Sequence, residues 1–104
     1  MLVMISFFMA ACTSDNGNNG TPGENEVWMQ NIAFVPQTLT VNPGTTVTWT
    51  NKDNVAHTVT RQGMFDSGQL QPGETFTYTF NTEGTYDYIC TIHLGMNGTI
   101  IVAQ

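Results

Sequence analysis

A strict alternation of apolar residues and threonines constrains the fold of this chain more than any other feature. Residues 46–50, TVTWT, and residues 75–80, TFTYTF, each place every second side chain on one face of an extended strand. Similar period-two runs recur from Glu26 onward, separated by short segments rich in Gly, Pro, Asn and Asp. No run has a helical period. We therefore predict an all-β domain, a β-sandwich of about seven short strands.

Two of the expected strands carry a potential metal ligand on their inward face. Residues 55–60, VAHTVT, place His57 on the face that its two neighbouring valines share. Residues 86–90, YDYIC, place Cys90 on the face that the two tyrosines share. Each residue lies at or near the end of its strand. We therefore expect both side chains to point inward at one end of the sandwich.

Residues 90–96, CTIHLGM, bring a thiol, an imidazole and a thioether together with no carboxylate between them. Thiolate and imidazole suit copper or zinc, whereas a thioether adds little for zinc and much for copper. The chain has one further histidine, His57, which would complete a trigonal set of two imidazoles and a thiolate with a weak axial thioether. We therefore predict that one copper ion is bound by His57, Cys90, His93 and Met96.

Each of these residues also has an ordinary structural interpretation. A buried cysteine is usually a small hydrophobic residue, and a single methionine usually fills space in the core. A tyrosine two residues before a cysteine is also typical of immunoglobulin domains, as Tyr88 stands before Cys90. The inter-sheet disulfide of that fold needs a second core cysteine, which residues 26–104 lack. The set as a whole favours the copper site.

The first 25 residues suggest export and attachment to a membrane. Residues 1–11, MLVMISFFMAA, are apolar and too short to span a bilayer, and they resemble a lipoprotein signal peptide ending before Cys12. No Lys or Arg precedes the apolar run, so we expect a start upstream of Met1. A plain secretory leader with an incidental Cys12 is the alternative. We expect residues 12–25 to form a flexible tether and residues 26–104 to form the domain.

The charge of the chain excludes one class of partner. Eight acidic residues against two basic ones give a formal net charge of −6, whereas nucleic-acid binding needs a basic face. Only one of the two cysteines, Cys90, lies beyond the expected leader and tether. The sequence therefore predicts neither nucleic-acid binding nor a disulfide framework.

Residues 26–104 resemble the cupredoxins, or type 1 blue copper proteins, and most closely their plastocyanin and amicyanin-like branch. The resemblance implies a Greek-key β-sandwich of about seven to eight strands, with the four copper positions of the family on His57, Cys90, His93 and Met96. The spacing after the cysteine is similar to the short amicyanin-type ligand loop. The segments that carry the resemblance are IAFVP (32–36), VTWTN (47–51), AHTV (56–59), FDSG (65–68) and GTYDYIC (84–90).

Several details of this chain lead to more specific expectations. Thr58 stands where the family commonly has Asn, which implies that an amide brace across the site is lost. Ile92 stands where plastocyanin-like loops have Pro, which returns a backbone N–H beside the thiolate. We expect a bulge near Asn31 and a long connection over residues 62–74. Met64 and Phe65 in that connection could pack in the core or form a rim around the metal.

Together these features predict an electron carrier rather than an enzyme. Four protein ligands leave copper no free position for a substrate, and no adjacent group offers a general base. In the family, electrons pass through the exposed edge of the loop histidine, here His93, within an apolar patch that Leu94, Gly95 and Met64 would supply. We expect a monomer that docks redox donor and acceptor proteins near His93 and Leu94, in the periplasm or on the cell surface. A copper storage or delivery protein is the alternative.

Overall fold

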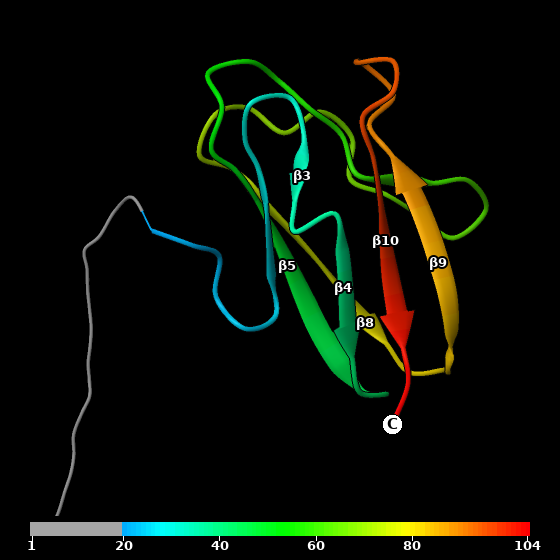
Figure 1. The fold of residues 1–104 in the computed structure, drawn as a ribbon. Helices are drawn as coiled ribbons and strands as arrows, with labels where there is room; N and C mark the ends of the chain where they lie inside the picture. The colour runs from blue at the N-terminus through cyan, green and yellow to red at the C-terminus, as the bar shows by residue number, and fades with distance from the viewer. Residues whose placement is uncertain (1–19) are drawn as a thin grey trace, which may run out of the picture.

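The structure, a computed structural model, describes residues 20–104 as a sandwich of two mixed β-sheets (Figure 1). One sheet has the strand order β4-β10-β9-β6-β7 and the other has the order β3-β2-β5-β8. The predicted all-β sandwich is confirmed, with nine strands in this part of the chain. They are β2 (Glu26–Met29), β3 (Phe34–Val35), β4 (Thr38–Val41), β5 (Thr45–Asn51), β6 (Thr60–Arg61), β7 (Phe65–Asp66), β8 (Thr75–Phe80), β9 (Gly84–Ile89) and β10 (Asn97–Val102).

The chain passes between the two sheets several times. Strands β2 and β5 pair in parallel within one sheet, and β4 and β10 pair in parallel within the other. Strands β9 and β10 form a long antiparallel hairpin, in which Ile89 pairs with Asn97. The loop of this hairpin lies at the end of the sandwich opposite the C-terminus, as Figure 1 shows. The connection from β5 to β6 reaches the same end of the molecule.

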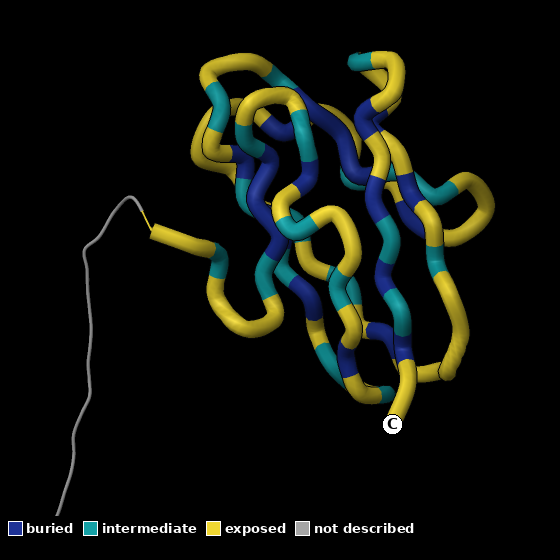
Figure 2. Tube along the Cα trace, viewed as in Figure 1, coloured by how far each residue is buried: buried dark blue, intermediate teal, exposed yellow. Residues whose placement is uncertain are grey.

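The alternation of the strands is confirmed in the core. Val47 and Trp49 are fully buried, whereas Thr46, on the opposite face of β5, is exposed. The Trp49 ring lies at the centre of an aromatic cluster, with its centroid 5.4 Å from that of Tyr88 and 5.7 Å from that of Phe76. Figure 2 shows buried residues recurring along the strands of both sheets. Burial of these large rings provides the main driving force for folding.

The expected bulge near Asn31 is wrong. Strand β2 ends at Met29, and Asn31 and Ile32 both have positive φ angles, of 57° and 55°. Two successive residues in this left-handed region reverse the chain in a tight turn. The chain therefore returns as β3, which pairs antiparallel with β2, and the Gln30 N–H donates to the Ala33 carbonyl to close the turn.

The expected regular strand over residues 55–60 is also wrong in part. His57 and Val59 are buried as predicted, but Val55 is 42% exposed and Thr58 is buried. The segment carries one isolated bridge, between His57 and Leu70, before β6 begins. The predicted long connection contains the short strand β7, which pairs with β6. The short strands β3 and β7 are additional to those predicted from the sequence, whereas β6 takes the place of the expected strand over residues 55–60.

The expected leader, Cys12 and most of the expected tether lie outside the described residues. Within residues 20–104, no helix is long and apolar enough to cross a membrane.

Candidate metal centre

Three of the four predicted ligands meet at one end of the sandwich. His57 comes from the connection between β5 and β6, Cys90 directly follows β9, and His93 lies in the loop between β9 and β10 (Figure 1). One ligand atom from each lies within 4.8 Å of the others. In the described part of the chain, this is the one cluster of three or more His, Cys, Asp and Glu side chains that could hold a metal ion.

The two imidazoles turn the same nitrogen toward the thiol. Cys90 Sγ lies 3.8 Å from His57 Nδ1 and 3.7 Å from His93 Nδ1, and the two Nδ1 atoms lie 3.1 Å apart. His57 is fully buried and Cys90 is 4% exposed, whereas His93 is half-buried. One sulfur and two nitrogens suit copper or zinc and do not suit Mg²⁺ or Ca²⁺, which prefer oxygen. The donor set therefore fits the metal predicted from the sequence.

The ligand loop is short and closed at its base. The Cys90 N–H donates to the Met96 carbonyl at 2.9 Å, and the Met96 N–H donates to the His93 carbonyl at 3.3 Å. Gly95 has a φ of 82°, a conformation that glycine adopts without strain, and it lets the loop turn back. Met96 is only 4% exposed, so its side chain is buried on the same loop as Cys90 and His93.

A buried threonine braces the Cys90 side of the site. The Thr58 N–H lies 3.4 Å from Cys90 Sγ, and the Thr58 hydroxyl accepts a hydrogen bond from the Thr91 N–H at 2.9 Å. As expected, no amide side chain bridges the site at this position; the Thr58 hydroxyl spans it instead. In the described residues, Cys90 Sγ contacts the Thr58 N–H and the two imidazoles, and the Ile92 N–H is not among its hydrogen-bond partners.

The opposite side of His57 contacts a carboxylate that sequence reasoning missed. His57 pairs with Leu70 through both backbone groups, and its Nε2 lies 2.7 Å from Asp53 Oδ2. Burial alone would raise the pKa of Asp53. Hydrogen bonds from the Ile32 N–H, from His57 and from the Asn31 N–H outweigh it and hold that pKa below its ordinary value. The aspartate four residues before His57 was the available signal in the sequence, but it lies in one of the polar segments that separate the expected strands.

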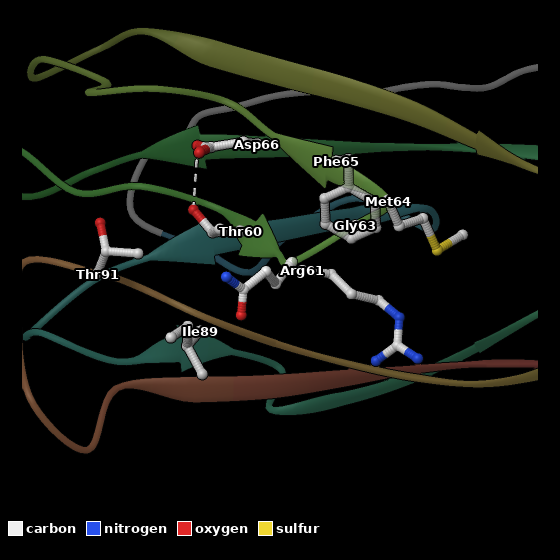
Figure 3. Close-up of a pocket in the computed structure, with 9 residues that line it drawn as sticks. Thr60, Arg61, Gly63, Met64, Phe65, Asp66, Ile89 and Thr91 are labelled. Atoms are coloured by element: carbon white, nitrogen blue, oxygen red, sulfur yellow. Dashed lines mark hydrogen bonds between the residues drawn. The ribbon is translucent and has the colours of Figure 1, made fainter.

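Met64 and Phe65, whose roles the sequence left open, lie in different environments in the structure. Phe65 is buried in the core, where its ring lies 4.7 Å from that of Tyr78. Met64 is 37% exposed and lines a surface groove of about 580 Å³ with Arg61 and Ile89 (Figure 3). His93 and Leu94 line a different hollow, with Cys90 and Met96. Leu94 is fully exposed at this hollow.

Comparisons with known proteins agree with this geometry. A family model for a cupredoxin-like domain matches residues 1–102. Amicyanin-alpha of Methylorubrum extorquens is 34% identical over 90 residues, which cover 77% of this chain and 72% of the relative. Plastocyanin of Scenedesmus fuscus is 33% identical over 89 residues, which cover 68% of this chain and 87% of the relative. A mutant amicyanin solved in its Cu(I) form superposes with a TM-score of 0.72 at 27% identity, covering 75% of this chain and 80% of that one.

Proposed function

Because the chain belongs to the cupredoxin-like family, we propose that it is a one-electron carrier with a single type 1 copper site. The observation that carries the proposal is the convergence of one thiol and two imidazole Nδ1 atoms within 4.8 Å. In the proposed site, His57, Cys90 and His93 would hold the copper ion, and Met96 would add a weaker thioether donor. Bound copper supplies the redox couple, Cu(I) and Cu(II).

The protein's own part in electron transfer is to keep the ligands rigid and shielded from water. His57 is fixed by its backbone pairing with Leu70, and Cys90 is fixed by the end of β9 and by the Thr58 N–H. Both ligands are buried, so water is kept from the thiolate. A rigid set of ligands changes little between the two oxidation states of copper. This lowers the reorganisation energy of each electron transfer. Four protein donors also leave no position for a substrate, which favours a carrier over an enzyme.

The electron would pass through the His93 side of the site. His93 is half-buried, whereas His57 is fully enclosed, and Leu94 next to His93 is completely exposed. A redox protein, donor or acceptor, could bring its own centre close by docking on this apolar surface. A copper storage or delivery protein could use the same four donors. It would be distinguished by passing copper faster than electrons.

We also propose a location for the carrier. Residues 1–11 have the pattern of a lipoprotein leader, so Cys12 would carry a lipid and residues 13–25 would hold the domain 26–104 beside a membrane outside the cytoplasm. Expression of the full chain in a bacterial host, behind an added lysine-containing n-region, followed by detergent-phase partitioning, tests this. The parent should enter the detergent phase and Cys12→Ser should not; equal partitioning of the two would contradict the lipid anchor.

Copper loading followed by absorption spectroscopy tests the site itself. Charge transfer from the Cys90 thiolate to Cu(II) should give an intense visible band in the parent protein. Cys90→Ser should abolish this band while far-UV circular dichroism still reports a β-fold. The other cysteine provides a matched control, because Cys12→Ser should keep the band unchanged. A colourless Cu(II) complex, or a band that survives Cys90→Ser, would rule out the type 1 site.

A further inference from the structure

The carboxylate of Asp53 joins two separate parts of the metal end, the turn between β2 and β3 and the imidazole of His57. Its Oδ1 accepts a hydrogen bond from the Asn31 N–H at 2.7 Å, and its Oδ2 accepts one from the Ile32 N–H at 2.9 Å. Oδ2 also lies 2.7 Å from His57 Nε2. The Asp53 side chain is 13% exposed and the His57 side chain is fully buried. Both carboxylate oxygens are therefore engaged in a largely desolvated position.

Asp53 is itself held in place by a buried asparagine. The Asp53 N–H donates to Asn51 Oδ1 at 2.9 Å, and Asn51 is only 1% exposed. Asn51 Nδ2 donates to the carbonyls of Val55 and Leu70, at 2.8 and 2.9 Å. Leu70 is the backbone partner of His57. One hydrogen-bonded amide thus fixes both the carboxylate and the backbone segment beside the imidazole.

This arrangement decides which nitrogen of His57 can bind a metal. A neutral imidazole carries one N–H, and the hydrogen bond made by one nitrogen determines the state of the other. With the proton on Nε2 and directed at Asp53, the lone pair of Nδ1 faces Cys90 and His93. Nδ1 is the atom that lies within 3.8 Å of Cys90 Sγ. The carboxylate therefore favours the tautomer that the site needs.

We propose that Asp53 is a positioning residue of the metal centre, which fixes the tautomer and ring orientation of His57 and lowers the reduction potential through its charge. This inference rests on the copper site proposed above. A negative charge one imidazole away from the metal stabilises Cu(II) more than Cu(I), because the attraction grows with the charge of the ion. Without Asp53, copper should bind more weakly and be reduced more easily.

Asp53 also stabilises the turn at Asn31 and Ile32, and this role must be distinguished from its effect on His57. Asn31 and Ile32 both adopt left-handed backbone angles, which are costly for a β-branched residue such as Ile32. The Asp53 carboxylate bonds both backbone N–H groups and so stabilises this turn. Ile32 lines a hollow together with Gly95 and Met96 of the ligand loop. Loss of Asp53 could therefore loosen the turn as well as His57.

Two substitutions distinguish these tasks. Asp53→Asn removes the charge but keeps one oxygen that can accept from His57 Nε2. Asp53→Ala removes both the charge and the acceptor. Asp87→Asn and Asp87→Ala are the matched controls, because the Asp87 carboxylate accepts from the Thr99 hydroxyl on the β9–β10 hairpin. All are made also in an Asn31→Gly background, since glycine adopts positive φ freely and should restore the turn if a variant unfolds.

The first measurement needs no metal. Nitrogen-15 NMR of the apo protein should show His57 with its proton on Nε2 in the parent, in Asp53→Asn and in both Asp87 controls. In Asp53→Ala the imidazole should populate both tautomers. A single Nε2–H tautomer in Asp53→Ala, within a folded protein, would overturn the positioning role.

The second measurement uses the copper-loaded full chain. Asp53→Ala should lower copper affinity about 10–100-fold relative to Asp87→Ala. Both Asp53 variants should have a higher reduction potential than the corresponding Asp87 controls. Potentials equal to those of the controls would overturn the electrostatic role while leaving a coloured copper site intact. If the parent protein itself forms no coloured copper complex, the proposed function fails, and the apo tautomer alone then decides whether Asp53 positions His57.

Discussion

The buried hydroxyl of Thr58 accepts a hydrogen bond from the Thr91 N–H at 2.9 Å, joining the residue after His57 to the residue after Cys90. Thr58 also directs its own N–H at Cys90 Sγ, 3.4 Å away. The Thr58 hydroxyl lies 3.0 Å from that of Thr60, which continues the network into β6. This small side chain therefore ties together two segments that lie 33 residues apart in the sequence.

Replacing Thr58 should reveal what this bond contributes. Thr58→Val keeps the shape of the side chain but leaves the Thr91 N–H without its acceptor. Because Thr91 is exposed and this bond is only partly buried, the loss should be about 0.5–1.5 kcal/mol. Urea unfolding of the apo protein measures this loss. Thr58→Ser retains the hydroxyl and should lose clearly less stability. Equal losses in the two variants would mean that packing of the methyl group, and not the hydrogen bond, is what matters.

Met96→Leu tests the axial position of the proposed site. A weak axial thioether adjusts the potential more than it holds the metal. The variant should keep bound, coloured copper, and its reduction potential should rise because a donor to Cu(II) has been removed. Voltammetry and the visible spectrum together measure this. Complete loss of copper would show instead that Met96 is a principal ligand.

Leu94→Glu separates electron transfer from metal binding. Leu94 is fully exposed beside His93, so the change adds a charge to the proposed docking surface and removes no ligand. Copper content and spectrum should stay normal, while electron self-exchange between two copies should slow through like-charge repulsion. Added salt should restore part of the rate by screening. NMR line broadening in mixtures of the oxidised and reduced forms measures the exchange rate.

A control for this experiment lies at the other end of the sandwich. Asn81 is exposed in the connection between β8 and β9, far from the ligand loop (Figure 1). Asn81→Glu adds the same charge and should leave self-exchange nearly unchanged. Slow self-exchange in the parent, together with rapid copper transfer to an acceptor protein, would contradict the carrier and favour a copper store.

Gly98→Ala tests the packing that supports the ligand hairpin. A Cβ atom at Gly98 would lie 2.5 Å from the Tyr88 hydroxyl oxygen and 2.6 Å from Cζ of the same ring. Tyr88 is 2% exposed, so its rigid ring has little room to move. The substitution should destabilise the apo protein by about 1–3 kcal/mol in thermal or urea unfolding. Gly20→Ala is the control, because a Cβ there meets nothing within 4 Å; a loss as small as the control's would show that the core can adjust.

The sequence by itself determined the architecture and the chemistry of the site. Alternation with a period of two predicted the sandwich and the inward direction of Trp49 and Tyr88, because a strand's faces follow directly from its sequence. The short segment from Cys90 to Met96 revealed the donor types, since ligands close in sequence must also lie close in space. His57 was found because the chain has only one other histidine.

Only the tertiary structure decided how those ligands are supported. Asp53 meets His57 and, at the end of the neighbouring strand β2 in the same sheet, the N–H groups of Asn31 and Ile32, which are 22 and 21 residues away. The Thr58 hydroxyl meets a partner 33 residues away. Nothing in the sequence indicated these contacts. Asp53 lies in a polar segment between two expected strands, and Thr58 lies on the face of its expected strand opposite to that of His57. Local periodicity shows which face of a strand a side chain occupies. A hydrogen bond between distant residues depends instead on how separate strands pack together, and no local pattern in a single sequence encodes that packing.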